Sequence, residues 1–301
     1  MRFAVETWAP EYGTPSEAEL AEVEVQPDVS IEVDAGDWGP MLPDVDPVDD
    51  VVFVDGVRRV DANVWIDQES GVPALGLCAT YAAGAVRCNG TAEVVAAEVR
   101  RGLFTAADGA ESIETRHGDY RVHRTSGSTP EELWLGIQSG MGRLEGEVSA
   151  GSREAGLVVV DGPLSHHRHV PEAVGFIKTQ HRHHLPEAQR PVAASLPAGR
   201  RTPLFLISQG PSRYSWYLRL AVGSGPLGGV VRCEASADRS VSEAARLADR
   251  VTATLPRFAS QAHKDPRAPQ NLYPIGGLER ALRRRLGDPQ LMFRALRRAA
   301  G

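Results

Sequence analysis

Two nearly identical segments constrain the fold of this chain more than any other feature. "VVFVDG" occupies residues 51–56 and "LVVVDG" occupies residues 157–162. Each is a continuous apolar run followed by Asp-Gly, a pattern typical of a buried central strand. An aspartate at the end of such a strand must leave the apolar layer, accept hydrogen bonds or bind a cation. If the two strands are neighbours, Asp55 and Asp161 lie together.

Asp-Gly is also a common turn dipeptide, so either aspartate taken alone could simply begin a turn. The duplication favours a shared site instead. Paired carboxylates are ligands for Mg²⁺ or Mn²⁺, and two-metal sites catalyse in-line displacement at phosphorus.

The remaining pattern predicts an α/β layout around a mixed sheet. Segments 51–56, 57–67 and 72–88 indicate a three-strand antiparallel meander. Residues 91–104 have helical spacing, and 113–125 indicate a strand or an irregular connection. Further strands are expected at 156–163, 173–178, 203–208, 214–222 and 228–234, the last two joined as a hairpin across "GSGP" (223–226). Helices are expected at 240–255, 275–286 and 289–299.

A helix beginning after Thr129 is well signalled by an N-cap, a proline at the first helical position and acids in the first turn. Its apolar stripe consists of Leu133, Ile137, Met141, Leu144 and Val148. The helix carries Glu145 and Glu147, each about 80° from the centre of that stripe. Helix geometry alone does not choose between these two glutamates.

Charge is distributed unevenly along the chain. Residues 1–56 contain fifteen Asp or Glu against Arg2 alone, whereas the last 45 residues contain ten Arg or Lys against three acids. We expect an acidic N-terminal arm (1–50) that packs on a main domain (51–301) with basic C-terminal helices. These helices could be merely solvated, or they could contact phosphates independently of sequence. The candidate DNA-binding residues are Arg280, Arg283, Arg284 and Arg285.

Neither a membrane span nor a secretory signal is expected, because no apolar run approaches about 18 residues and the N-terminus lacks an apolar core. We therefore expect a cytoplasmic protein. Cys78, Cys88 and Cys233 form no CxxC pair and are odd in number, which favours core positions over disulfides.

Six of the nine histidines lie between residues 166 and 184. They have no cysteine nearby, and their spacing does not match an HExxH motif, so a zinc site is not favoured. We expect them to lie in loops near the substrate, where partial protonation would add contacts to phosphate.

A meander whose first strand carries Asp, a helix carrying Glu and a strand carrying a second Asp resemble the ribonuclease H-like fold of divalent-metal nucleases. More specifically, the chain resembles the NurA family, DNA-end resection nucleases that act with the hexameric HerA translocase. The matching segments are "VVFVDGVRRVDA" (51–62), "GRLEGE" (142–147), "VVVDGPL" (158–164), "VGFIK" (174–178), "SWYLRL" (215–220), "VVRCE" (230–234) and "NLYPIGGLERAL" (271–282).

This resemblance implies Asp55, Glu145 and Asp161 as ligands for Mn²⁺ or Mg²⁺. It places Lys178 near the scissile phosphate, with Tyr217 or Arg219 nearby. It also implies a homodimer that acts with a HerA-like ATPase on DNA, in DNA repair or phage defence. The choice of Glu145 over Glu147 rests on the resemblance alone.

The chain departs from the family at its C-terminal helix, where NurA proteins usually carry a histidine after a Tyr-Pro turn. Here "IGGLERAL" follows Tyr273-Pro274. Glu279 or His263 could replace the missing ligand; without a replacement, the chain could be a catalytically silent DNA-binding or scaffold subunit. A third possibility is an actin-like kinase, for which "GSGPLGG" (223–229) would be the adenosine loop.

Overall fold

The computed structural model of the 301-residue chain describes residues 3–5, 26–178, 184–208, 210–223, 227–261, 263–265 and 267–301. The strands are β1 (Phe3–Val5), β2 (Val51–Ile66), β3 (Ala74–Asn89), β4 (Thr91–Thr105), β5 (Arg121–Arg124), β6 (Leu157–Asp161), β7 (Ala173–Ile177), β8 (Phe205–Ile207), β9 (Arg213–Arg219) and β10 (Val230–Ser236). The α-helices are α1 (Pro130–Ala150), α2 (Arg190–Ala194), α3 (Val241–Thr254), α4 (Tyr273–Arg285) and α5 (Pro289–Ala299). Short 3₁₀ turns occupy Ala35–Asp37, Glu187–Gln189 and Leu255–Phe258.

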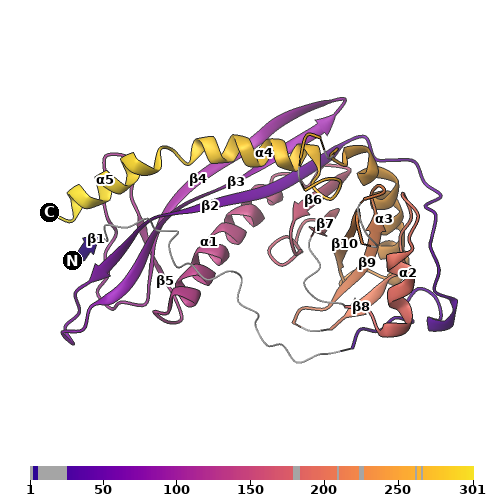
Figure 1. Cartoon of the computed structure of the whole chain (residues 1–301), viewed down its shortest axis with the longest axis horizontal. Helices are drawn as coiled ribbons and strands as arrows, with labels where there is room; N and C mark the ends of the chain where they lie inside the picture. The colour runs from indigo at the N-terminus through magenta and orange to yellow at the C-terminus, as the bar shows by residue number, and fades with distance from the viewer. Residues whose placement is uncertain are drawn as a thin grey trace.

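The described strands form one mixed sheet in the order β5-β4-β3-β2-β6-β7-β10-β9-β8, with β1 paired to β2 (Figure 1). Strands β2, β3 and β4 are antiparallel neighbours, and β6 is parallel to both β2 and β7. An antiparallel meander is thus followed by parallel strands, and helices cover both faces. The predicted α/β class is confirmed, and the arrangement is consistent with a ribonuclease H-like fold.

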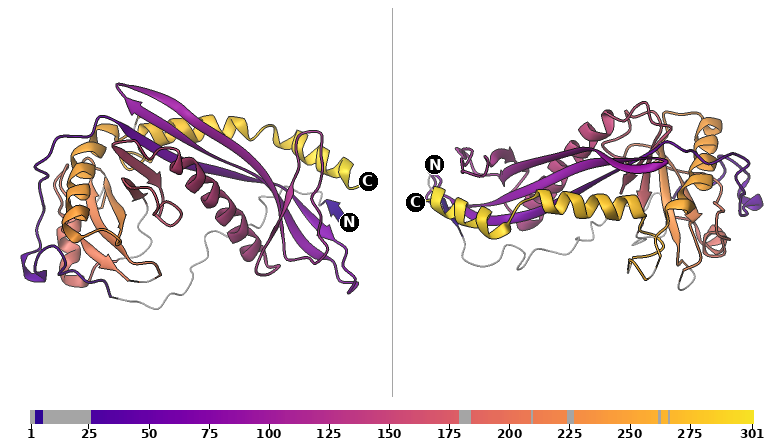
Figure 2. Two further views of the ribbon diagram at one scale, coloured as in Figure 1. Left: turned by 180° about the vertical axis from the view of Figure 1, so that it is seen from behind. Right: turned by 90° about the horizontal axis from the view of Figure 1, so that it is seen from above.

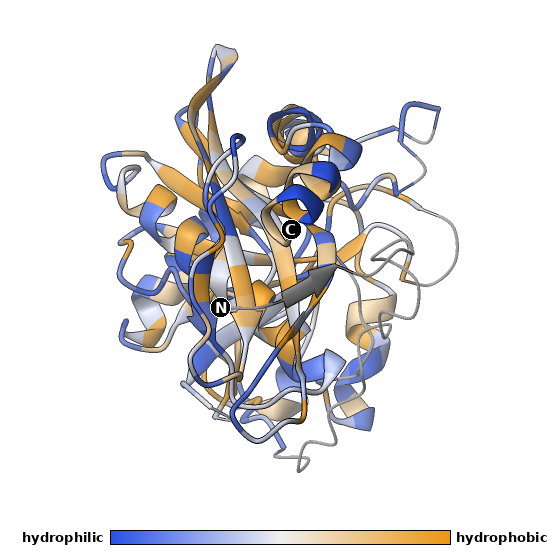
Figure 3. Ribbon diagram, turned by 90° about the vertical axis from the view of Figure 1, so that its left-hand side faces the viewer, coloured by the Kyte–Doolittle hydropathy of each residue, from blue (hydrophilic) through white to orange (hydrophobic). Residues whose placement is uncertain are grey.

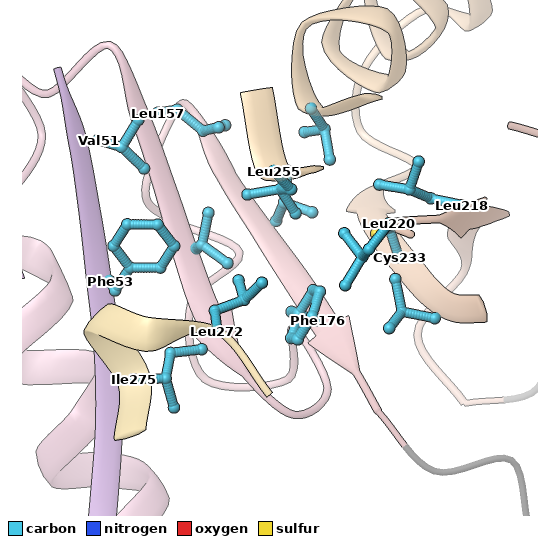
Figure 4. Close-up of a cluster of buried hydrophobic side chains, with 14 of the residues drawn as sticks. Val51, Phe53, Leu157, Phe176, Leu218, Leu220, Cys233, Leu255, Leu272 and Ile275 are labelled. Carbon is cyan, nitrogen blue, oxygen red and sulfur yellow. The ribbon is translucent and has the colours of Figure 1, made fainter. Parts of the chain in front are cut away.

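Alternation along the central strands explains why helices cover both faces of the sheet. Phe53 and Val159 pack with Ile275 of α4 in one apolar cluster. Figure 4 shows part of this cluster, with side chains from β2, β6, β7 and α4 meeting between the layers. Val54 and Leu133 belong to the cluster on the other face, beneath α1.

The meander is much longer than the parallel part of the sheet. β2 pairs with β6 only from Val51 to Val54 and with β1 only from Val64 to Ile66. No described strand pairs with this edge of β2 between those two regions. Helices α4 and α5 extend along one side of the projecting meander, and α1 crosses its other face (Figure 2). The first aspartate therefore lies where β2 leaves its parallel neighbour.

The predicted helix at 91–104 is wrong, because Thr91–Thr105 is strand β4. Its residues pair with β3 along their whole length, through a register shift between Ala85 and Val86 of that strand. The alanines and glutamates of this segment favour a helix locally, but pairing with a long neighbouring strand overrides this helix propensity. The meander therefore consists of β2, β3 and β4.

The predicted break between 56 and 57 is also wrong. Val51–Ile66 is one continuous strand, so Asp55-Gly56 lies within β2 and does not begin a turn. The second copy behaves differently, because β6 ends at Asp161 and Gly162 has a φ of 105°. The two Asp-Gly pairs thus share a sequence but differ in backbone conformation.

Other predicted elements are confirmed with shifted ends. Thr129 caps α1 in a reciprocal capping box with Glu132, and all five residues of the predicted apolar stripe are buried. The three cysteines are buried in strands, as expected. β9 and β10 pair antiparallel, whereas residues 224–226 of the expected turn lie outside the described residues. No helix in the described ranges is both long and apolar enough to cross a membrane.

Residues 26–50 run over the end of the sheet formed by β8 and β9. Asp28 pairs with Leu206, and Met41 pairs with Arg201. The Arg201 side chain is almost fully buried and forms ion pairs with Glu32 and Asp249 at 2.8 and 2.7 Å. This segment is therefore fixed to the body by backbone and ionic contacts, whereas all the acidic residues that precede it lie outside the described part.

Candidate active site

Asp55 and Asp161 lie where β2 and β6 stop pairing. The last paired residues are Val54 and Val160, so the two aspartates are the next residues on adjacent parallel strands. By strand alternation they lie on the α4 side, like Phe53 before them. Both line one cleft of about 320 Å³. The structure thus brings together the two aspartates that the duplicated motif singled out.

Glu145 approaches this point from α1, on the opposite face of the sheet. Its carboxylate lies against Gly56, and a Cβ atom at position 56 would overlap Oε1. Glu147 instead forms an exposed ion pair with Arg100. Of the two glutamates on α1, the structure therefore places Glu145 next to β2, through the space that Gly56 leaves.

Burial and neighbouring carboxylates raise the pKa values of all three carboxyl groups. Burial, followed by the charges of Asp161 and Glu145, raises the pKa of Asp55 well above its usual range. Burial also raises the pKa of Asp161, although Lys178 opposes the rise. Burial and Asp161 raise the pKa of Glu145 to about 8. A nearby divalent cation would reverse these preferences, because it stabilises the ionised forms.

Lys178 lies directly after β7 and contacts the second aspartate. Its Nζ donates hydrogen bonds to Oδ2 of Asp161 at 2.6 Å and to Oδ1 of Asn271 at 3.0 Å. Asn271 is buried, and its Nδ2 donates to Oδ2 of Asp265 at 2.5 Å. The sequence analysis missed Asn271 and Asp265, since residues in an irregular loop before a helix give no periodic signal.

Glu279 of α4 also lines the cleft but already has cationic partners. It forms ion pairs with Arg267 and Arg283, both at 2.9 Å. Burial opposes its ionisation, but hydrogen bonds from the two arginines outweigh burial and lower its pKa. Arg267, which the sequence analysis did not single out, lines the cleft as well.

Three predicted residues are not brought to the carboxylates. His263 is exposed in a turn and does not line the cleft. Tyr217 is buried in β9 against Phe205, with ring centroids 5.8 Å apart. Because β9 is three strands from β6, that position is about 14 Å from the Asp161 strand. Arg219, also on β9, donates hydrogen bonds to the carbonyls of Ala194 and Gly228. These two β9 residues have structural contacts that short motifs could not reveal.

The predicted DNA-binding arginines are exposed on α4. Arg280, Arg283, Arg284 and Arg285 lie away from the buried positions of this helix, and Arg283 also lines the cleft. Figure 3 shows hydrophilic segments on the helices near the C-terminus. The exposed arginines of α4 therefore adjoin the cleft through Arg283.

Two histidines of the loop after β6, His166 and His167, pack against α1. His167 is buried, its Nδ1 lies 2.9 Å from Ser149 Oγ, and burial lowers its pKa to about 4. His166 packs against α1 where Gly142 and Gly146 leave space. The expectation of a partly protonated phosphate contact is therefore wrong for His167. Residues 181 and 183 lie outside the described residues.

The donor set is chemically suited to a hard divalent cation, since three carboxylates approach one another in a buried setting. In the described ranges, however, no three His, Cys, Asp or Glu side chains converge closely enough to hold one ion. Asp161 is hydrogen-bonded to Lys178, and Glu145 lies beneath the strand. Binding of one ion by all three carboxylates would require these side chains to rearrange.

No protein-family profile matches the chain, and no curated protein matches it. The relationship to NurA proteins therefore stays a prediction from short motifs.

Proposed function

We propose that this protein is a divalent-metal-dependent deoxyribonuclease. The observation that carries the proposal is the pair Asp55 and Asp161. They directly follow the last paired residues of two adjacent parallel strands, their pKa values are raised, and they line a cleft together with arginines. Such carboxylates suit Mg²⁺ or Mn²⁺, and arginines suit phosphate.

Asp55 and Asp161 would hold the ions, with Glu145 as a third ligand. When bound there, Mn²⁺ or Mg²⁺ would activate water and stabilise the leaving 3′ oxygen of a DNA phosphodiester. Lys178 would neutralise charge that develops on the phosphate. Arg267 and Arg283 would orient the phosphate backbone of the DNA. The exposed arginines of α4 would attract double-stranded or single-stranded DNA.

The motif resemblance supports a more specific setting. The nuclease would form a homodimer and process DNA ends together with a hexameric HerA-type translocase. It would act in the cytoplasm, in DNA repair or in defence against phage. Co-purification of the two proteins and DNA degradation that depends on ATP hydrolysis would test this partnership.

A second candidate function is a DNA-binding subunit without catalytic activity. Specific ion pairs favour it. Lys178 is paired with Asp161, and two arginines are paired with Glu279. Glu279 is the residue that would have to replace the histidine of the NurA family. In this case the arginine surface would still bind DNA, but Mn²⁺ would not cause degradation.

The deciding experiment measures degradation of linear DNA by the purified protein in Mn²⁺, in Mg²⁺ and in EDTA. Asp161→Asn should abolish metal-dependent degradation while leaving the thermal unfolding curve cooperative. Asp238→Asn is the matched control, because the Asp238 carboxylate is largely exposed outside this cleft. Activity retained in Asp161→Asn would refute the assignment, and wild-type protein that binds DNA without degrading it would favour the second function.

A further inference from the structure

The cleft that contains the aspartates extends along the edge of β2 that no described strand pairs with. After Asp55 it is lined by Gly56, Val57 and Arg58, and it reaches Trp134 in the first turns of α1. Arg58 is three positions after Asp55 on an extended strand, a distance of about 10 Å. One continuous cleft therefore joins the carboxylates to an aromatic side chain.

Trp134 and Arg58 form a stacked pair at this end. The Arg58 guanidinium carbon lies 4.7 Å from the centroid of the indole ring. Leu133 and Ile137 provide the buried stripe of α1, whereas Trp134 packs only partly against that core and remains partly exposed. The guanidinium covers one face of the indole, so the pair presents to the cleft a guanidinium plane that is supported by the aromatic ring.

The two ends of the cleft differ in chemistry. One end holds the carboxylates and, near them, Arg267 and Arg283, which suit a metal ion and a phosphate. The other end offers the guanidinium plane of Arg58, supported by the indole of Trp134, and such a plane stacks on nucleobases regardless of sequence. A nucleotide with its phosphate at the first end could direct its base toward the second.

A base can reach such a surface only when it is unpaired and unstacked, since both faces of a base in duplex DNA are covered by its neighbours. We propose that Trp134 and Arg58 bind an unpaired nucleobase next to the reacting phosphate, so that the preferred substrate is single-stranded DNA. The proposal rests on the proposed nuclease function and specifies the substrate class of that same site.

Binding without cleavage provides the test. The intact protein, in EDTA, is titrated into a fluorescently labelled oligothymidine and into a blunt hairpin duplex. Because Trp134→Ala removes the ring that supports the stacking guanidinium, this variant should weaken single-strand binding about fivefold or more and change duplex binding less than twofold. Trp134→Phe should retain most of the affinity. Trp65→Ala is the control, since Trp65 is another partly exposed tryptophan at the far end of β2.

A second measurement needs no variant and decides the matter if Trp134→Ala does not fold. Wild-type protein should bind the oligothymidine at least about fivefold more tightly than an abasic oligonucleotide of equal length and charge. Equal affinities, or an equal loss on strand and duplex in the folded variant, would overturn the inference even if the protein degrades DNA. If wild-type protein neither binds nor degrades DNA, the proposed function fails and this inference with it.

Discussion

Replacing Glu145 by glutamine should stabilise the metal-free protein at high pH. Glu145 is buried, and burial beside Asp161 raises its pKa from 4.5 to about 8. The folded state therefore binds this proton more tightly than the unfolded chain does. Stability is greatest below the unfolded pKa and is lost as the pH rises from 4.5 to about 8.

The magnitude follows from the size of that shift. At about 1.4 kcal/mol per pKa unit, the lost free energy of unfolding approaches about 5 kcal/mol as an upper bound. Coupling to the aspartates and relaxation reduce it, so we expect Glu145→Gln to gain roughly 2–5 kcal/mol over wild type at pH 9. Near pH 5 the two proteins should differ little, because a protonated carboxyl group and an amide place similar demands on the site.

Urea unfolding in EDTA at pH 5, 7 and 9 measures this difference directly. Glu147→Gln is the matched control from the same helix, because Glu147 forms an exposed ion pair with Arg100 and should contribute at most about 1 kcal/mol. Adding Mn²⁺ at 100 times its Kd should stabilise the wild type by about 2.7 kcal/mol, and Glu145→Gln by less. A Glu145→Gln variant whose advantage does not grow with pH would refute the reasoning from buried like charges.

Three further predictions concern the packing of the site and of other parts of the fold. Gly56→Ala should displace the Glu145 carboxylate and destabilise the fold by about 1–3 kcal/mol with loss of Mn²⁺-dependent stabilisation, whereas Gly277→Ala, which has open space around it, should do neither. Wild type should lose about 3 kcal/mol between pH 6.5 and 4 through His167, whose folded pKa is lowered to about 4, and His167→Gln should lack this loss in urea unfolding. Arg201→Met should leave two carboxylates without their buried cation and cost about 3–5 kcal/mol by the same measurement.

The sequence predicted the meeting of Asp55 and Asp161 for a physical reason. Apolar runs in parallel strands are buried on both faces, so their periodicity and their ends are visible in the chain. The helix after Thr129 was equally visible, since its cap, proline and apolar stripe are local signals. These features required no knowledge of long-range contacts.

What the sequence could not predict depends on partners distant in the chain. Thr91–Thr105 is a strand because β3 extends beside it, although its alanines and glutamates favour a helix. Tyr217 is buried against Phe205, a pairing that no motif specifies. Asn271 reaches Lys178 across a separation of 93 residues. Each of these outcomes is decided by tertiary packing, which local periodicity does not record.

The arrangement around β2 also links the architecture to the proposed chemistry. Because β6 pairs with β2 only as far as Val54, no described strand covers the edge of β2 between Val54 and Val64. The cleft follows that edge from Asp55 to Trp134. Gly56 lies on the same edge, and its lack of a side chain leaves the space in which the Glu145 carboxylate approaches from the other face. A longer β6 would cover this edge with strand hydrogen bonds and remove the cleft. The early end of one strand therefore creates both the place where the carboxylates meet and the surface along which a substrate strand could lie.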